Sequence, residues 1–284
     1  MHYVIYSKGL VSTWILDYPH RLLYDCGEGC ATALGAGVYA VEAICLSHCH
    51  VDHLAGLPTF INLRNLGKGA NEKPLTVFYP ASNARVREWL QFILKRQHLK
   101  YEVACRPLAA DELMQIQGGR NPKFLQGFPV PHGREPSFGY RVLEERQRVK
   151  APYSQWPPEQ IAALMRSLPA AERPNYMETY RKPIVAYTGD AMPLAPGPQC
   201  PFWEAETLFH DATFLNPADR EQLAHATLEE AVQSALDNRV GKLYGIHVSN
   251  RYFGREIREA EARGRERLPT LSLVDPSRVV EIEE

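Results

Sequence analysis

The alternation of apolar and polar positions along the chain predicts strands and helices in turn. Short apolar runs between turn residues are typical of buried strands, and apolar positions repeating every three or four residues are typical of helices. The predicted strand segments, with the polar residues that end them, lie at 4–6, 12–16, 21–25, 43–46, 75–79, 128–132, 137–142, 184–190, 207–214 and 242–249, and near residue 280. The predicted helices lie at 54–61, 83–97, 158–168 and 228–238, with a linker at 65–74. Because strands and helices alternate without an internal repeat, we expect an α/β architecture.

The densest polar cluster, Ser47-His48-Cys49-His50-Val51-Asp52-His53, directly follows the apolar run at 43–46. In an extended backbone the side chains at 48, 50 and 52 share one face, and the turn into the next helix brings His53 beside them. Nitrogen and carboxylate ligands that converge at a strand end suit a metal such as zinc. A polar loop that is merely rich in histidine is the alternative, and the density of ligands favours the metal. We expect Cys49 to point to the opposite face and to be a core residue.

Polar residues also end most of the other predicted strands. The candidates are Asp25, His132, Asp190, His210 with Asp211, and His247, together with His225 just before a helix that Thr227 and Glu230 begin as a capping box. Each is weak alone, because a lone aspartate after a strand is commonly a turn former or a cap. Three further histidines, His2, His20 and His98, have no such setting, and we expect them to be solvated.

The composition narrows the class of protein. The chain has 284 residues, 45% of them hydrophobic, which suits one large or two small globular domains. Its 33 acids and 32 bases argue against an overall basic nucleic-acid binder, although a local basic patch is compatible with them. The six cysteines form no C-x-x-C pair, so we expect reduced thiols in a cytoplasmic protein. Neither a signal peptide nor a run long enough to cross a membrane is apparent.

The order of these motifs resembles the metallo-β-lactamase fold and, more narrowly, the ribonuclease Z (tRNase Z) family, endonucleases that trim the 3′ end of precursor tRNA. The series Asp25, His48-x-His50-x-Asp52-His53, His132, Asp190 and His247 is similar to the ligand series of the superfamily. The narrower resemblance rests on His210-Asp211-Ala212-Thr213 in place of H-E-A-T, on His225-Ala226-Thr227 in place of H-S-T, on His247-Val248-Ser249-Asn250-Arg251-Tyr252, which is similar to H-F-S-x-R-Y, and on Ser137-Phe138-Gly139-Tyr140. It covers nearly the whole chain.

The resemblance implies a single four-layer αββα domain with two zinc ions per chain, or manganese in their place. One ion would bind His48, His50 and His132, the second would bind Asp52, His53 and His247, and Asp190 would bridge both. Two adjacent metals can activate a water and stabilise the oxygens of an in-line displacement at phosphorus. The catalytic set would be Asp52, His225 and Asp211, with His225 protonating the departing ribose 3′-oxygen and Asp211 orienting it. Asp25 would be a structural residue near the site.

The resemblance further implies precursor tRNA as substrate, a 3′-hydroxyl left on the tRNA, a homodimer, and no action on DNA. The chain departs from the family in having Asp211 for glutamate and a short loop, Ser7–Leu10, in which only Lys8 would contact phosphate. A short insert at about 143–182 replaces the long gripping arm, and residues 141–182 hold eight bases and five acids. Arg146, Arg148 and Lys150 would contact phosphates there. The alternative for the insert is a solvated loop followed by the predicted helix at 158–168.

Two other functions remain open at this point. The first is a hydrolase of the same fold that acts on a small phosphodiester, a sulfate ester or a lactone, since these enzymes share the metal ligands. The pair formed by Asp211 and His225 and the basic insert argue against it. The second is a non-catalytic RNA-binding relative, and against it stands the presence of every ligand position in the series.

Overall fold

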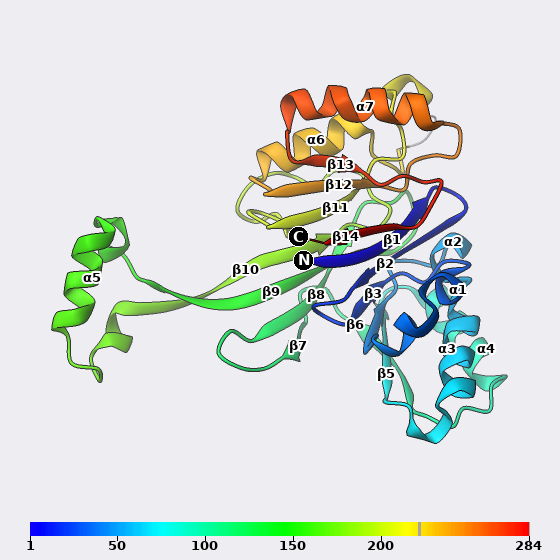
Figure 1. Cartoon of the computed structure of the whole chain (residues 1–284), viewed down its shortest axis with the longest axis horizontal. Helices are drawn as coiled ribbons and strands as arrows, with labels where there is room; N and C mark the ends of the chain where they lie inside the picture. Colours follow the sequence, from blue (N-terminus) through cyan, green and yellow to red (C-terminus); the bar gives the residue numbers. More distant parts are fainter. Residues whose placement is uncertain (221–222, 284) are drawn as a thin grey trace.

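Two seven-stranded sheets form the centre of the computed structural model, which describes residues 1–220 and 223–283 (Figure 1). The first sheet has the order β14 (Val280–Glu283), β1 (His2–Lys8), β2 (Ser12–Asp17), β3 (Leu22–Tyr24), β4 (Ala43–Cys45), β5 (Leu75–Pro80) and β6 (Val103–Leu108). The second has the order β13 (Leu271–Leu273), β12 (Lys242–Ile246), β11 (Thr207–Asp211), β10 (Met177–Tyr187), β9 (Ser137–Val149), β8 (Lys123–Val130) and β7 (Leu113–Gln117). The sheets stack face to face on a shared apolar layer that includes Tyr3, Ile5, Tyr140 and Tyr187.

Helices cover the outer face of each sheet, and this confirms the predicted four-layer αββα sandwich. The first sheet is covered by α1 (Cys30–Leu34), η1 (Gly35–Tyr39), α2 (Val51–Leu54), α3 (Leu57–Gly67), η2 (Gly69–Asn71) and α4 (Ala84–Lys95). The second is covered by α6 (Leu228–Asp237) and α7 (Gly254–Arg267), and the short η5 (Pro217–Asp219) lies nearby. No helix of the described residues is long and apolar enough to span a bilayer.

The direction of the strands explains where polar side chains gather. In the first sheet β3, β4, β5 and β6 are parallel, and in the second β10, β11, β12 and β13 are parallel. The carboxyl ends of parallel strands meet at one edge of a sheet, and the loops there carry ligands in open α/β sheets. The two sheets place these loops side by side, so residues that follow strands in both sheets can share one site.

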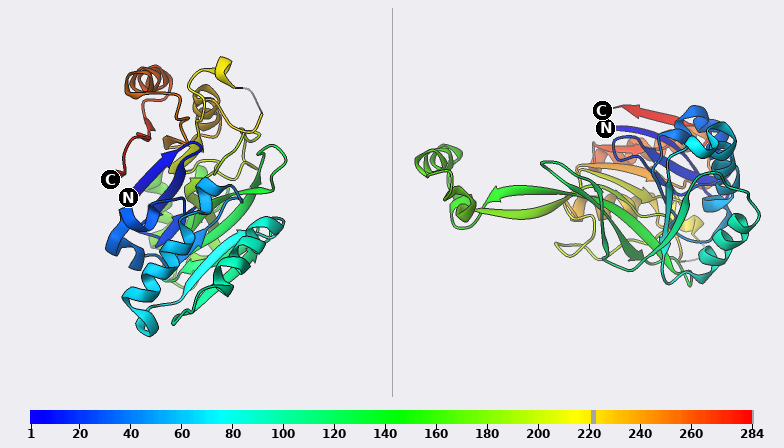
Figure 2. Two further views of the ribbon diagram at one scale, coloured as in Figure 1. Left: turned by 90° about the vertical axis from the view of Figure 1, so that its right-hand side faces the viewer. Right: turned by 90° about the horizontal axis from the view of Figure 1, so that it is seen from below.

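An arm projects from the second sheet (Figures 1 and 2). Its stalk is an antiparallel ribbon in which β9 and β10 pair from Tyr140 and Tyr187 out to Val149 and Met177. Its tip holds η3 (Tyr153–Gln155), α5 (Pro158–Ser167) and η4 (Arg173–Tyr176). From residue 144 to residue 183 no side chain is buried. The insert is therefore a strand ribbon with a helical tip: the predicted helix at 158–168 corresponds to α5, and the segment before it is solvated but forms part of β9.

Several predicted elements are confirmed and others were missed. Asn83 caps α4 by accepting a hydrogen bond from the amide of Val86, and Thr227 and Glu230 form the predicted capping box. The predicted linker at 65–74 is largely helical, because α3 continues to Gly67. Arg64 of α3 is buried and donates hydrogen bonds to Glu72 and to the carbonyl of Val41, and these bonds fix the turn beyond the helix. The prediction omitted β6, β7, β13 and α7. Few side chains of β6, β7 and α7 are buried, and β13 has only three residues.

Two predictions about single residues are wrong. His20 is buried and its Nδ1 lies 2.7 Å from the carboxylate of Asp17, so it is not solvated. Cys49 is only half-buried, and its thiol donates to Glu135 across 2.9 Å. The partner of Cys49 comes from a distant loop, whereas Asp17 lies only three residues before His20, and the sequence does not show that this turn is buried. His98 is exposed as predicted, and His2 is half-buried beside Glu281.

Candidate metal centre

Four of the predicted ligands converge from both sheets. His48 and His50 lie in the loop after β4, His132 follows β8, and Asp190 follows β10. One ligand atom from each lies within 4.8 Å of the others. Gly189 makes this convergence possible, because its positive φ of 62° turns the chain after β10 and an added Cβ would lie 2.9 Å from the Cβ of Ser47.

A second group of ligand atoms lies directly beside the first. It consists of Asp52, His53 and His247, whose ligand atoms also lie within 4.8 Å of one another. The carboxylate of Asp190 borders both groups, with Oδ2 at 3.6 Å from Nε2 of His48 and Oδ1 at 3.4 Å from Nε2 of His247. Asp52 does not share an extended stretch with His48, as the alternation suggested, but lies in the first turn of α2. The structure nevertheless brings all seven predicted ligands together.

The unpaired atoms of this cluster fit a divalent metal. Nε2 of His48, Nε2 of His53 and Oδ1 of Asp190 are buried and have no hydrogen-bond partner among the described residues. Leaving buried polar atoms unpaired is costly, so such atoms call for a ligand. Burial holds the pKa of His48 well below its usual value, which keeps the ring neutral and able to coordinate. Burial alone would raise the pKa of Asp190, but the neighbouring His247 and His53 hold it well below its usual range.

Asp25 ties the ligands to the second sheet. Its carboxylate accepts hydrogen bonds from the amide and hydroxyl of Ser47, both at 2.7 Å, from Nδ1 of His53 at 2.7 Å, and from the hydroxyl of Tyr187 in β10. Because a carboxylate only accepts, Nδ1 of His53 carries the proton and Nε2 is free for a metal. The hydroxyl of Ser47 donates to Asp25 and so accepts from Nδ1 of His48 at 2.9 Å. Sequence reasoning placed Asp25 near the site and missed Ser47 and Tyr187.

His225 lies beside the ligand cluster, held by Asp211. Its Nδ1 is 2.8 Å from Oδ2 of Asp211, and its ring stacks on that of His247 with centroids 5.1 Å apart. Asp211 therefore reaches His225 although its side chain is shorter than that of glutamate. Burial lowers the pKa of His225, but the hydrogen bond and the charge of Asp211 outweigh it and raise that pKa to about 9. The imidazole is thus protonated at neutral pH and can donate a proton.

Thr213 is a residue that sequence reasoning missed. Its hydroxyl donates to Oδ1 of Asp211 at 2.7 Å and lies 2.9 Å from Nδ1 of His247. Since the hydroxyl has one proton and the carboxylate takes it, Nδ1 of His247 must donate to Thr213. This tautomer leaves Nε2 of His247 facing Asp52 and Asp190. The sequence feature that could have identified Thr213 is its position at the end of the motif His210-Asp211-Ala212-Thr213.

The predicted phosphate contacts do not lie at the metal centre. Lys8 ends β1 and lines a separate hollow of about 530 Å³ with Arg258 and Arg278. In the arm, Arg146 pairs with Glu144 and Glu206, and Arg148 pairs with Glu178 at 2.6 Å. Lys150 is exposed and has no ion pair with the residues that the structure describes. The net charge of the insert overstates its free positive charge, because acids pair with four of its eight bases, Arg146, Arg148, Arg181 and Lys182.

Comparison with known proteins places this site in a family. A family model described as the Beta-lactamase superfamily domain matches residues 20–167, and the chain belongs to this superfamily. Its histidine and aspartate clusters mark it as a member that uses divalent metal.

Within the superfamily the chain is similar to ribonuclease Z proteins, and this confirms the resemblance that the motifs indicated. It is 26% identical over 304 residues to ribonuclease Z of Gemmatimonas aurantiaca, covering 97% of this chain and 91% of that protein. It is 27% identical over 261 residues to the chloroplastic tRNase Z TRZ2 of Arabidopsis thaliana, covering 89% and 69% of the two chains. The crystal structure of human tRNase Z, short form, has the same fold, with a TM-score of 0.67 at 18% identity over the full length of both chains.

Proposed function

We propose that this protein is a metal-dependent endoribonuclease that removes the 3′ trailer of precursor tRNA and leaves a 3′-hydroxyl on the tRNA. The observation that carries the proposal is the pair formed by His225 and Asp211. These two residues have ligand atoms within 4.8 Å of those of Asp190 and His247, but Nδ1 of His225 is engaged by Asp211 at 2.8 Å, which leaves the ring to act as a proton donor. A ribose 3′-oxygen is a poor leaving group, and a positioned acid is what its departure requires. The similarity to proteins named ribonuclease Z supports the same reaction.

We propose two zinc ions per chain as the metals, with manganese as an alternative. His48, His50 and His132 would hold one ion, Asp52, His53 and His247 would hold the other, and Asp190 would contact both. When bound, the metals supply Lewis acidity that activates water at neutral pH and stabilises the charge developing on the phosphoryl oxygens.

The side chains around this site have separate tasks. His225 uses Nδ1 to bind Asp211, so its Nε2 is the atom that can donate a proton to the ribose 3′-oxygen. Asp211 positions the ring and stabilises its positive charge, as its hydrogen bonds from Thr213 and from the amide of Ala191 keep it fixed. Asp52 is more exposed than Asp190, with 14% of its side chain accessible, and we assign to it the orientation of the attacking water.

The finer proposals concern partners and location. The arm would contact the tRNA at a distance from the scissile phosphate, with Lys150, Arg166 and Arg173 as its exposed bases that pair with no acid among the described residues. A homodimer, in which the arm of one subunit serves the site of the other, follows from the family resemblance. The six free cysteines suit a reducing compartment such as the cytoplasm.

Cleavage of precursor tRNA tests the function directly. Zinc-loaded protein is incubated with precursor tRNAs that do or do not encode CCA, and both product ends are mapped. We expect a tRNA with a 3′-hydroxyl and a trailer with a 5′-phosphate. If the protein hydrolysed a small phosphodiester but left the precursor tRNA intact, this result would instead support the alternative function, a hydrolase of small esters.

A further inference from the structure

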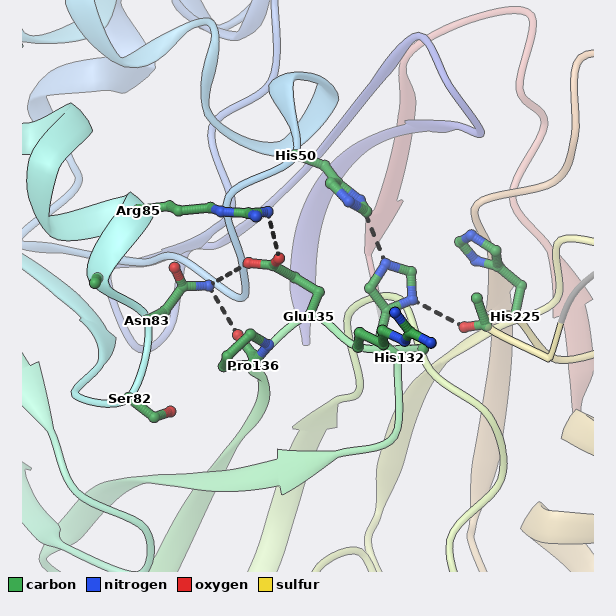
Figure 3. Close-up of a pocket in the computed structure, with 12 residues that line it drawn as sticks. His50, Ser82, Asn83, Arg85, His132, Glu135, Pro136 and His225 are labelled. Atoms are coloured by element: carbon green, nitrogen blue, oxygen red, sulfur yellow. Dashed lines mark hydrogen bonds and ion pairs between the residues drawn. The ribbon is translucent and has the colours of Figure 1, made fainter.

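A pocket of about 550 Å³ extends from the metal centre along the surface of the protein (Figure 3). At one end it is lined by His225, and His132 and His50 lie next to it. Beyond these histidines it is lined by the first turn of α4 and by the segment 133–136. Two arginines line the pocket, Arg85 in the first turn of α4 and Arg134 two residues after the ligand His132. Its volume is in the range of pockets that hold a nucleotide-sized ligand.

We propose that this pocket is the binding site of the 3′ trailer, in which the first trailer nucleotide lies beyond the metal centre and the phosphate that follows it binds Arg85 and Arg134. The inference rests on the proposed endoribonuclease function and adds to it the path of the leaving strand. It assigns a role in substrate binding to two residues for which no sequence motif indicated one.

The direction of the trailer follows from the position of the proton donor. His225 must lie next to the ribose 3′-oxygen, which remains with the tRNA, so the end of the pocket at His225 is the side of the tRNA body. The phosphorus stays with the trailer after cleavage. The trailer therefore leaves the centre away from His225, and the pocket continues in that direction past His50 to Arg85 (Figure 3).

The two arginines have donors available for a phosphate. Arg85 binds Glu135 through Nη1 at 3.2 Å, and 75% of its side chain is accessible. A guanidinium carries five N–H groups, so most of those on Arg85 remain for a ligand. Arg134 is exposed and pairs with no acid among the residues that the structure describes. Charge-assisted bonds from arginine to phosphate are among the stronger hydrogen bonds in proteins.

Glu135 also lines this pocket, but its carboxylate is already satisfied by hydrogen bonds from neighbouring side chains. Its carboxylate accepts hydrogen bonds from the thiol of Cys49 at 2.9 Å, from Nδ2 of Asn83 at 2.7 Å, and from Arg85. Asn83 also donates to the carbonyl of Pro136 at 2.8 Å while it caps α4. This clasp fixes the segment that follows the ligand His132 against α4, so the arginines are presented from a rigid wall.

The test uses binding of two small products to the zinc-loaded protein. The probes are a nucleoside 5′-monophosphate, which has only the phosphate for the metal centre, and a 5′-phosphorylated dinucleotide, which adds the next phosphate. The dissociation constant of each is measured by titration with a fluorescent derivative and by competition. We expect the dinucleotide to bind the unaltered protein about tenfold more tightly, since a hydrogen bond to a charged group contributes enough for that ratio.

The double variant Arg85→Gln with Arg134→Gln should bring this ratio close to one while leaving the affinity for the mononucleotide and the zinc content unchanged. The matched control is Arg87→Gln, an exposed arginine of the same helix that does not line the pocket, and it should keep the ratio. Equal binding of the two probes to the unaltered protein, or a ratio that survives in the double variant, would overturn the inference. Because the ratio needs no cleavage of tRNA, failure of the proposed function would show separately as intact precursor tRNA.

Discussion

The edge of the sandwich that carries the metal ligands (the metal-centre edge) and the arm differ in the burial of their side chains and in the interactions that fix them. At the edge, His48, His53 and Asp190 are at most 2% exposed, and the second nitrogen of each of these histidines is fixed by a hydrogen bond. In the arm, no side chain from residue 144 to residue 183 is buried, and the ribbon is held by strand pairing and by ion pairs at its surface. The edge is preorganised by the whole sandwich, whereas the arm depends on little beyond its own two strands.

This contrast separates chemistry from binding. A reacting group must be held within a fraction of an ångström, and side chains fixed by packing and by hydrogen bonds from neighbouring residues achieve this. Contacts remote from the reaction can come from an exposed ribbon, because they contribute binding energy and not alignment. Changes at the edge should therefore affect every substrate, and changes in the arm should affect only large ones.

Asp190→Ala should have the largest effect. Asp190 borders both ligand groups, so its loss should lower bound zinc below two per chain and reduce cleavage of tRNA and of a small phosphodiester by about a thousandfold or more. His247→Ala should empty mainly one site. Zinc content by atomic absorption and both rates are measured, with Asp237→Ala, an exposed aspartate of α6, as control. Two tightly bound zincs and full activity in Asp190→Ala would refute the ligand assignment.

His225→Ala should slow the cleavage of tRNA and spare the small phosphodiester, although His225 lies beside the metal ligands. Removing a general acid costs roughly 10²–10⁴-fold when the leaving group is a basic alkoxide. A nitrophenolate needs no proton, so hydrolysis of a nitrophenyl phosphodiester should stay near its original rate, and zinc content should not change. The control is His98→Ala, an exposed histidine far from the ligand groups in the sequence. Equal loss on both substrates, or loss of zinc, would make His225 a ligand or a structural residue.

Shortening the arm should have the opposite selectivity. Replacing residues 150–176 by two glycines removes the tip and should reduce tRNA cleavage by about a hundredfold, since phosphate contacts far from the centre are lost. Hydrolysis of the small phosphodiester and the thermal midpoint should be unchanged, because the tip buries no side chain. The tRNA rate of the full chain should fall more steeply with salt than that of the shortened one. A lower thermal midpoint would show that the arm supports the fold.

Of these four changes to the protein, Thr213→Val should have the smallest effect. It removes the hydroxyl that Nδ1 of His247 and the carboxylate of Asp211 share, while keeping the shape of the side chain. Loss of such an orienting partner lowers metal affinity by about tenfold or somewhat more. Zinc affinity is measured by competition with a chelator, and Thr213→Ser should restore it. An unchanged affinity in Thr213→Val would mean that packing alone orients His247.

The sequence predicted the residues that end strands better than the contacts that hold them. His48, His132, Asp190 and His247 each follow an apolar run, and a run of that kind is visible without a structure. Tyr187 and Asn83 carry no such signal, because the atoms that they bind lie far away in the sequence, and the same holds for the contact of Thr213 with His247. His20 was missed for a different reason: its partner Asp17 is only three residues away, but the sequence does not show that this turn is buried.

The arm shows the limit of counting charges. Eight bases and five acids between residues 141 and 182 indicated a basic surface. The strand register sets Arg148 opposite Glu178 and Arg181 opposite Glu145, so opposite charges face one another across the ribbon. Register depends on the pairing of two segments about thirty residues apart along the chain, and no local pattern specified it.

The carboxylate of Asp25, which joins His53 and Ser47 to Tyr187 of the second sheet, has a consequence for the heat resistance of the protein. Since the ligands of either metal come from both sheets, binding to the native state is linked to the docking of one sheet on the other. Free zinc at a hundred times its dissociation constant would add about 2.7 kcal/mol to the free energy of unfolding for each site. The melting temperature should then rise with the zinc concentration and fall when a chelator is added, because bound metal stabilises the state in which the two sheets are docked.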